Sequence, residues 1–309
     1  MIKRVIRRYL ENFYKRIIEK NDSLKFIIGK QLCFSQKNIN SNKLSDIEFK
    51  VFSQWGEDGI IEYLVDKLPI KNKFFIEFGV ENYNESNTRF LMMNRNWGGM
   101  IIDGSEVNIN YVKNRDYFWK YDLNPIASFI TKENINSLIS EKLKGLNIEK
   151  DVGILSVDID GVDYWVLNEI SYIDATIIIC EYNSIFGNDY ALTVPYSKDF
   201  IREEYHYSNL YWGANLKAFD KLLSKKDYLY IGSNQQNSNA FFVKKELAEK
   251  YLKDLIRNIP DFEVSKFRES RDKNGKLNLI RGKNRQSEIK ELELINLDTN
   301  KNIKIKELF

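Results

Sequence analysis

The chain has few cysteines, and their positions exclude two kinds of site. Of its 309 residues, only Cys33 and Cys180 are cysteine. They lie too far apart for a CxxC metal motif, and a single pair is not a disulfide framework. Cys180 stands within an isoleucine-rich run, which predicts a buried thiol. We therefore expect a protein of a reducing, cytoplasmic setting.

The sequence also lacks long apolar runs and a strong net charge. No stretch of about 18 consecutive apolar residues occurs, so we expect no membrane-spanning helix. The formal net charge is only +3, which gives no support for nucleic-acid binding. Hydrophobic residues make up 43% of the chain and aromatic residues 14%, which is enough for a packed core.

The first 30 residues depart from this balance of charge. They hold nine lysines or arginines against three acidic residues. Apolar residues recur at helical spacing, with basic residues between them, at Ile2, Ile6, Tyr9, Phe13 and Ile17. We predict a basic amphipathic helix without the apolar core of a signal peptide. It could lie on an anionic membrane surface, or it could dock on its own domain or on a second subunit.

Three short apolar runs each end in a carboxylate followed by a glycine. They are Phe74–Gly79, Met100–Gly104 and Ile154–Gly161. Such runs, bounded by turn residues, are typical of buried parallel strands. The carboxyl ends of parallel strands meet at the edge of the sheet where α/β proteins bind ligands. We therefore expect Glu77, Asp103 and Asp158 to share one pocket.

Strands and helices alternate from residue 51 onward and end in a hairpin. The expected strands are 73–79, 99–103, 117–121, 153–158 and 175–181, followed by the pair 228–233 and 240–244. This order predicts an α/β fold with a doubly wound, mostly parallel seven-stranded sheet. We expect four regions: the basic helix 1–30, a polar linker 31–50, the main domain 51–260 and a small β appendage 261–309.

Four motifs in this order resemble the FkbM-type group of S-adenosylmethionine-dependent methyltransferases. They are Ser53–Gly59 (SQWGEDG), Ile76–Val80 (IEFGV), Val157–Gly161 (VDIDG) and Cys180–Asn183 (CEYN). The resemblance covers about residues 51–245. It implies a class I methyltransferase fold, S-adenosylmethionine as cofactor and, commonly, O-methylation of a sugar or another hydroxyl-bearing metabolite. It also implies cofactor contacts at Gln54, Glu77 and Gly79.

Two further acids follow expected strand ends and are candidates for contact with the same cofactor. Asp103 lies 26 residues after Glu77, where an acid can accept hydrogen bonds from ribose hydroxyls. Asp122 follows the expected third strand, where it could contact the adenine amine or serve a turn. The alternative for Glu77 and Asp103 is that they cap the helices that follow them.

Asp158, Asp160 and Glu181 form a second predicted cluster. Three carboxylates at adjoining strand ends could hold Mg²⁺ through their oxygens. They could equally provide a general base, because crowded acids raise one another's pKa. The structural alternative is a turn at Asp160-Gly161 with Asp163 as a helix cap. No lysine or arginine lies in these motifs, which favours a metal ion as the counter-charge.

His206 is the only histidine, in a loop rich in tyrosine. Its side chain titrates near neutral pH, so it is a candidate general base, although a lone loop histidine is more often incidental. The neighbouring aromatic residues could stack on sugar faces or pack the loop down.

Three functions compete at this point. The first is methyl transfer to a small-molecule or glycan acceptor, such as a hydroxyl of a cell-surface polysaccharide precursor. The second is a glycosyltransferase that uses Asp158-Ile159-Asp160 as a metal-binding DxD. The third is a non-catalytic relative that forms a homo-oligomer through the basic helix and the tail. We prefer the first, because Glu77 and Asp103 have no role in the second.

Overall fold

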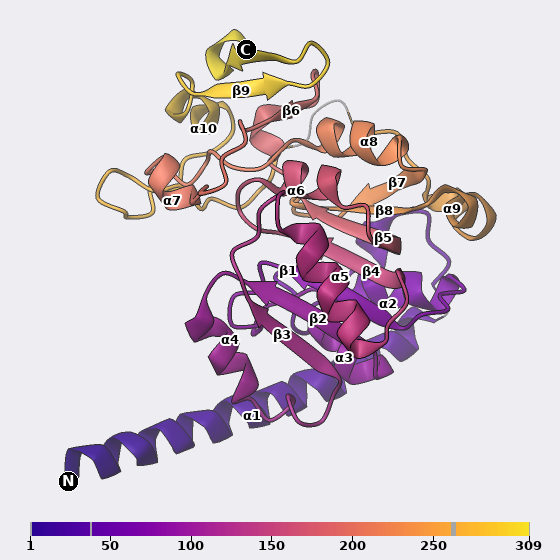
Figure 1. Ribbon diagram of the computed structural model, residues 1–309, viewed down its shortest axis with the longest axis vertical. Coiled ribbons are helices and arrows are strands. Elements are labelled where there is room, and N and C mark those ends of the chain that lie inside the picture. The colour runs from indigo at the N-terminus through magenta and orange to yellow at the C-terminus, as the bar shows by residue number, and fades with distance from the viewer. Residues whose placement is uncertain (1, 38, 261–263, 309) are drawn as a thin grey trace.

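A seven-stranded sheet forms the centre of the molecule (Figure 1). The structure, a computed structural model, describes residues 2–37, 39–260 and 264–308, without the side chains of 2–12 and 14–16. The strands are β1 (Phe74–Phe78), β2 (Gly98–Asp103), β3 (Leu123–Ala127), β4 (Asp151–Val157), β5 (Asp174–Glu181), β7 (Tyr228–Ser233) and β8 (Asn239–Lys244). Their order is β3-β2-β1-β4-β5-β8-β7, and only β8 runs antiparallel to its neighbours. The predicted fold class, an α/β fold with a doubly wound, mostly parallel seven-stranded sheet, is confirmed.

Helices cover both faces of this sheet. Along β1 the side chains of Phe74, Ile76 and Phe78 enter one apolar core, while Phe75 enters the other, because successive residues of a strand point to opposite faces. The first core is covered by α5 (Ile135–Leu146), α6 (Asp163–Glu169) and α8 (Leu216–Ser224). The second is covered by α2 (Glu57–Lys67), α3 (Arg89–Arg95), α4 (Glu106–Lys113) and α9 (Lys245–Tyr251).

The third strand is not where the sequence predicted it. Residues 117–121 form turns, and Tyr117 is buried against Tyr83, with ring centroids 6.0 Å apart. The strand is β3, which contains Pro125. A proline is tolerated there because β3 is an edge strand, where one N–H faces no neighbour. Asp122 therefore precedes the strand, near Gly98 at the start of β2, and the expectation that it follows a strand end is wrong.

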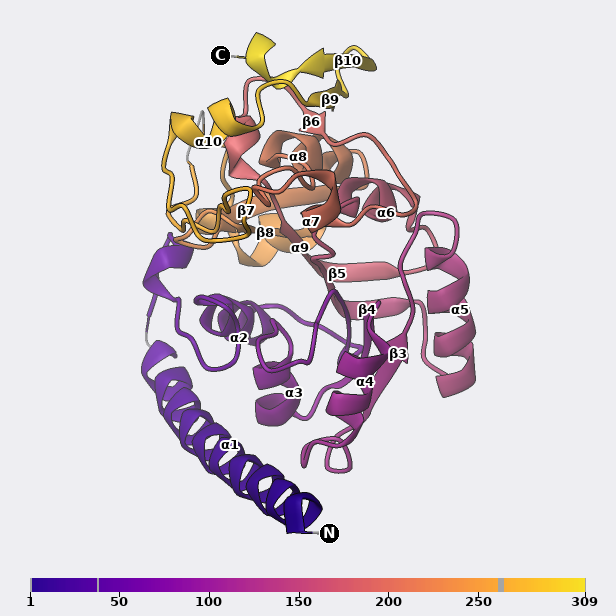
Figure 2. The same ribbon diagram turned by 90° about the vertical axis from the view of Figure 1, so that its left-hand side faces the viewer.

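The N-terminal helix α1 runs from Ile2 to Gln36, so it takes up part of the expected linker. Its second half docks on the domain: Asp22 pairs with Arg89 and Arg115, and Gln36 Nε2 donates to the carbonyl of Gly59 at 2.8 Å. Its first half extends away from the domain (Figures 1 and 2). Among the described residues, no helix has the length and apolar character needed to cross a membrane.

The C-terminal region contributes two strands to a second, three-stranded sheet. Strands β9 (Glu293–Asn296) and β10 (Lys301–Lys304) pair with each other, and β9 also pairs with β6 (Leu192–Thr193). The second sheet thus joins the end of the chain to the long loop that follows β5. That loop also holds η2 (Ser184–Phe186) and α7 (Arg202–Tyr205), and the tail holds α10 (Lys283–Glu288) and η4 (Ile305–Glu307). The shorter helices η1 (Leu44–Asp46) and η3 (Lys253–Leu255) complete the chain.

Replacing Asp22 by asparagine tests how firmly α1 is docked. The side chain of Asp22 is 15% exposed, and those of its partners Arg89 and Arg115 are 1% and 5% exposed. Asp22→Asn leaves two buried guanidinium groups without their counter-charge. We expect the free energy of unfolding, measured with urea, to fall by about 3 kcal/mol.

Glu291→Gln is the matched control for this variant. Glu291 also bridges two cations, Lys304 and Lys306, but its side chain is 57% exposed. Water screens such a pair, so we expect no measurable change in the free energy of unfolding. Equal losses in the two variants would contradict a buried docking contact for α1.

Candidate functional site

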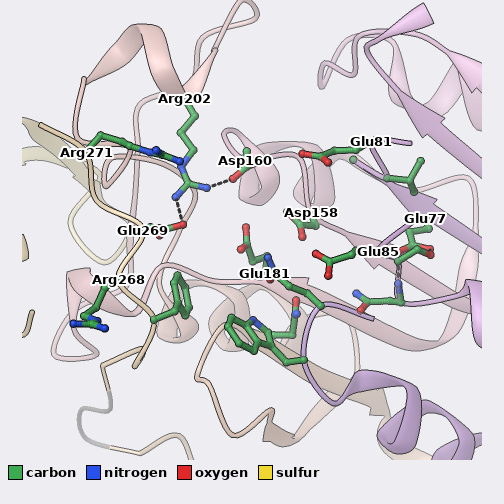
Figure 3. A pocket seen from close by; sticks show the side chains of 18 of the residues that line it. Glu77, Glu81, Glu85, Asp158, Asp160, Glu181, Arg202, Arg268, Glu269 and Arg271 are labelled. Carbon is green, nitrogen blue, oxygen red and sulfur yellow. Dashed lines mark hydrogen bonds and ion pairs between the residues drawn. The ribbon is translucent and has the colours of Figure 1, made fainter. Parts of the chain in front are cut away.

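A cavity of about 460 Å³ opens at the carboxyl ends of β1, β4 and β5. The strand order reverses between β1 and β4, and open α/β sheets bind ligands at such a point. Six of the predicted site residues line the cavity: Gln54, Glu77, Gly79, Asp158, Asp160 and Glu181. Figure 3 shows the side chains of Glu77, Asp158, Asp160 and Glu181 among those that line it. Residues more than 100 positions apart in the sequence, such as Glu77 and Glu181, thus meet at one edge of the sheet.

A smaller cavity of about 160 Å³ adjoins the first. The two share wall residues at Gly79, Glu81, Asp158 and Asp160. Asp103 stands at the edge of the smaller cavity, and the rest of the wall is mainly apolar: Ile102, Phe129, Ile130, Ile159, Val162 and Phe200. A slot with mainly apolar walls and the carboxyl groups of Asp103, Glu81, Asp158 and Asp160 beside them suits a ligand that carries both an aromatic ring and hydroxyl groups.

Glu77 is engaged by the loop that precedes α3. Its carboxylate accepts hydrogen bonds from the Ser86 hydroxyl at 2.8 Å and from the backbone N–H groups of Asn87 at 2.7 Å and Thr88 at 3.1 Å. Burial raises the pKa of Glu77, and these bonds oppose the rise. These contacts agree with the alternative that Glu77 caps the start of the helix that follows. The side chain nevertheless also lines the cavity.

Asp103 braces two loops in a similar way. One carboxylate oxygen accepts from the Glu81 N–H at 2.7 Å, and the other accepts from the Ser105 N–H at 2.8 Å. Ser105 in turn caps α4 by accepting from the backbone of Asn108. Asp103 therefore ties the loop after β1 to the end of β2 and presents its carboxylate to the smaller cavity.

Gly79 is fixed by the backbone of the neighbouring strand. Its φ of +69° lies in the left-handed region, and an added Cβ would stand 1.5 Å from the carbonyl oxygen of Asp158. Only glycine permits so close an approach. The loop after β1 consequently passes close to the backbone at the end of β4, and both residues at this crossing, Gly79 and Asp158, line the two cavities.

The cluster of Asp158, Asp160 and Glu181 is present. Their carboxylate oxygens lie within 4.8 Å of one another. Burial and the neighbouring charges raise the pKa of Asp158 and of Glu181 well above the ordinary range. At neutral pH such a cluster favours a bound proton or a bound cation over three free charges.

The turn that carries Asp160 is held by Asp163. Asp160 adopts the left-handed conformation, with φ of +54°. The buried carboxylate of Asp163 accepts from the N–H groups of Ile159 at 2.7 Å and Gly161 at 3.0 Å. Asp160-Gly161 therefore forms the turn that was the alternative to a functional role. This turn sets the position of the Asp160 side chain in the cluster.

Arg202 supplies a counter-charge that the sequence did not reveal. Its guanidinium pairs with Asp160 and, at 2.8 Å, with Glu269 (Figure 3). It also lies over the ring of Trp212, 4.7 Å from the centroid, and donates to the carbonyl of Asn209. The expectation that no cation lies near the cluster is therefore wrong. Two carboxyl groups of the cluster, Asp158 and Glu181, remain without a pairing guanidinium among the described contacts.

The C-terminal segment forms one wall of the larger cavity through Phe267, Arg268, Glu269, Arg271 and Leu277. Phe267 stacks on Trp55, with ring centroids 5.9 Å apart. Arg285 anchors the segment by donating to the backbone carbonyl of Ser265 at 2.7 Å. This contribution was not predicted, because the tail carries no motif.

Several buried polar atoms at this site have no partner. Within the described part of the chain, the indole N–H of Trp55, Oε2 of Glu181 and Oδ1 of Asn239 lack a hydrogen bond, and all three residues line the larger cavity. An unpaired buried polar atom is costly. Their grouping in one cavity indicates a polar ligand.

Two predicted site residues are not brought to these cavities. Asp122 lies at the opposite end of the sheet, beside the start of β2. His206 is absent from the described residues that line either cavity. Its Nδ1 instead pairs with the Ser208 hydroxyl at 2.7 Å, and burial lowers its pKa. Neither residue is placed to act with the cluster.

Comparison with known proteins gives a likeness of architecture. No family model and no curated protein matches the chain. Among solved structures, the N-terminal domain of EvdMO1 with SAH bound shares 12% identity, with 62% of this chain and 80% of that one covered and a TM-score of 0.41. The plantazolicin methyltransferase BpumL in complex with SAH shares 14%, with 70% and 72% covered and a TM-score of 0.35. The O-methyltransferase from Bacillus cereus in complex with SAH shares 10%, with 71% and 88% covered and a TM-score of 0.34. At these values the likeness assigns no activity to this chain.

The cluster predicts a stability that depends on pH. The pKa values of Asp158 and Glu181 are raised in the folded protein. Their contribution to the free energy of unfolding is therefore fully present below the ordinary pKa of about 4, and it is lost as the pH rises through the raised pKa values. Glu181→Gln cannot ionise. We expect this variant to be more stable than the wild type at pH 8, with the difference vanishing near pH 4, in urea unfolding without divalent ions.

The exposed Glu246 of α9 provides the control. Glu246→Gln should follow the wild-type profile at every pH, because the side chain stands in water. If Glu181→Gln also followed that profile, ionisation of the cluster would not affect folding.

Proposed function

We propose that this protein transfers a methyl group from S-adenosylmethionine to a hydroxyl of a sugar or glycan precursor. The observation that carries the proposal is the pair of adjoining cavities over the crossing of the β1 loop and β4. The smaller one has mainly apolar walls, with Asp103 and the three acids that it shares with the larger one beside them. The other is acidic and has unpaired polar atoms in its wall.

The smaller cavity is suited to the adenosine part of the cofactor. Phe129 and Ile130 offer an apolar surface to the adenine ring, and Asp103 offers acceptors to the ribose hydroxyls. Each oxygen of a carboxylate can accept about two hydrogen bonds, and Oδ2 of Asp103 accepts one, from Glu81. The aminoacyl end would extend past Gly79 into the larger cavity, toward Gln54 and Glu77. The bound cofactor supplies an electrophilic methyl group on its sulfonium.

The carboxylate cluster is suited to a divalent cation. Three oxygens within 4.8 Å of one another, one of them on a residue with an unpaired buried oxygen, match the ligands that Mg²⁺ and Mn²⁺ prefer. Such a cation would replace the proton that the cluster otherwise favours, and it would lower the pKa of a bound hydroxyl. Arg202 holds Asp160 in position for this arrangement.

The acceptor side is formed by Trp55 and the C-terminal segment. A volume of about 460 Å³ is ample for a sugar unit. The Trp55–Phe267 pair offers an aromatic face, and Glu81 and Glu269 offer hydrogen-bond acceptors to hydroxyl groups. We assign residues 264–277 to acceptor binding on this basis.

Calorimetry with S-adenosylhomocysteine tests the cofactor assignment. We expect the wild type to bind it, and Asp103→Asn to weaken binding about tenfold, since a hydrogen bond to a charged group contributes about 1.5–3 kcal/mol. Asp122→Asn is the matched control, because Asp122 lies at the other end of the sheet, and its affinity should not change. Thermal unfolding would confirm that both variants fold.

The same experiment separates the competing functions. Glu77 and Asp103 brace loops, so they no longer argue against a DxD glycosyltransferase. Binding of a UDP-sugar with Mn²⁺, without binding of S-adenosylhomocysteine, would overturn the methyltransferase proposal. Binding of neither would favour the non-catalytic relative.

Metal titration tests the cluster. We expect the wild type to bind one Mn²⁺ in calorimetry, more tightly at pH 8 than at pH 6, because the cation competes with the protons on Asp158 and Glu181. Asp160→Asn should weaken the binding, whereas Glu291→Gln on the surface should not. If labelled methyl transfer to a polysaccharide precursor continued fully in excess chelator, Asp158 would instead be the general base, and Asp158→Asn should then abolish it.

A further inference from the structure

Helix α1 packs on the domain with one of its faces. Along its second half, Asp22, Phe26, Gly29 and Cys33 recur at helical spacing and face the domain. The ring of Phe26 lies 6.1 Å from that of Phe90. An added Cβ on Gly29 would stand 2.6 Å from Val51 and 2.7 Å from Phe90, so this face of the helix lies against the domain without a gap.

The opposite face of α1 is also apolar, and it is exposed. Leu24, Ile27, Ile28 and Phe34 are 61%, 63%, 59% and 62% exposed. At 3.6 residues per turn they form one stripe, roughly 120–180° around the helix from the docked face. Phe13 and Ile17, at 51% and 48% exposed, continue this stripe toward the N-terminus. In the sequence the same spacing continues through Ile2, Ile6 and Leu10, whose side chains lie outside the described ones.

The positive charge of α1 indicates what kind of surface binds this stripe. Lys20, Lys25 and Lys30 are exposed, and residues 1–30 hold nine basic against three acidic residues, which leaves the rest of the chain net acidic. Two copies of this helix packed stripe to stripe would bring like charges together. An anionic lipid surface provides both an apolar layer and the opposite charge.

A loop next to α1 adds an exposed aromatic side chain. Arg115, which pairs with Asp22 of α1, begins the turns that lead to β3. Trp119 in these turns is 76% exposed. Tryptophan favours the boundary between water and lipid, because its ring is apolar and its N–H is polar.

We propose that α1 lies along the surface of an anionic membrane and holds the domain there. The helix has 35 residues and would extend for about 50 Å in the plane of the interface. Its exposed stripe would enter the lipid between the head groups, its lysines would contact anionic head groups, and its docked face would carry the domain.

Sedimentation of the full chain with lipid vesicles tests this proposal. We expect binding to vesicles of phosphatidylcholine with phosphatidylglycerol, weak binding to phosphatidylcholine alone, and release in 1 M salt, where charges are screened within about 3 Å. Leu24→Ser/Ile28→Ser removes apolar surface without changing charge and should lower the partition coefficient at least about tenfold. Both positions are exposed, so thermal unfolding should not change.

Tyr190→Ser/Tyr251→Ser is the matched control, since these tyrosines are 46% and 41% exposed on other parts of the chain. This variant should bind vesicles as the wild type does. Equal binding by Leu24→Ser/Ile28→Ser and the wild type would overturn the proposal. So would a dimer in analytical ultracentrifugation that only the Leu24/Ile28 variant loses, because a second copy would then cover the stripe.

Discussion

Arg202 joins three parts of the chain that are distant in sequence. Its guanidinium holds Asp160 after β4, Glu269 of the C-terminal segment, and the carbonyl of Asn209 in the loop after β5. Without it, the carboxyl groups of Asp158, Asp160, Glu181 and Glu269 would face one another in a partly buried cavity, where like charges repel more strongly than in water. The single guanidinium of Arg202 reduces the repulsion between these carboxyl groups, but it does not balance all of their charge. The remaining acid excess is the physical reason to expect a proton or a cation at Asp158 and Glu181.

Several acids of the recognisable motifs accept hydrogen bonds from backbone or side-chain amides and so hold the loops in place. In the motif at 53–59, the buried carboxylate of Asp58 accepts from three consecutive N–H groups, at Val51, Phe52 and Ser53, and its pKa is raised to about 6 by burial. Glu57 accepts from the amides of Asn234 and Asn239 at the turn between β7 and β8. Together with Glu77 and Asp103, these acids fix the loops that surround the cavities.

The sequence predicted most of the sheet because its buried strands are short apolar runs with clear boundaries. It did not predict β3, because Asn124 and Pro125 are uncommon in strands. They are tolerated there because β3 lies at the edge of the sheet and needs few hydrogen bonds. The cluster at Asp158, Asp160 and Glu181 could be predicted from strand ends alone. Arg202 and Glu269 could not, because they come from irregular segments whose position depends on tertiary packing. His206 and Asp122 were proposed from residue type, and packing placed them elsewhere.

A crystal structure with S-adenosylhomocysteine and Mn²⁺ would test the central claim, that the two cavities hold a cofactor and a cation side by side. We predict adenosine density between Asp103 and Phe129, and an anomalous manganese peak among Asp158, Asp160 and Glu181. Adenosine bound away from the β1–β4 crossing, with no manganese at the cluster, would contradict the account.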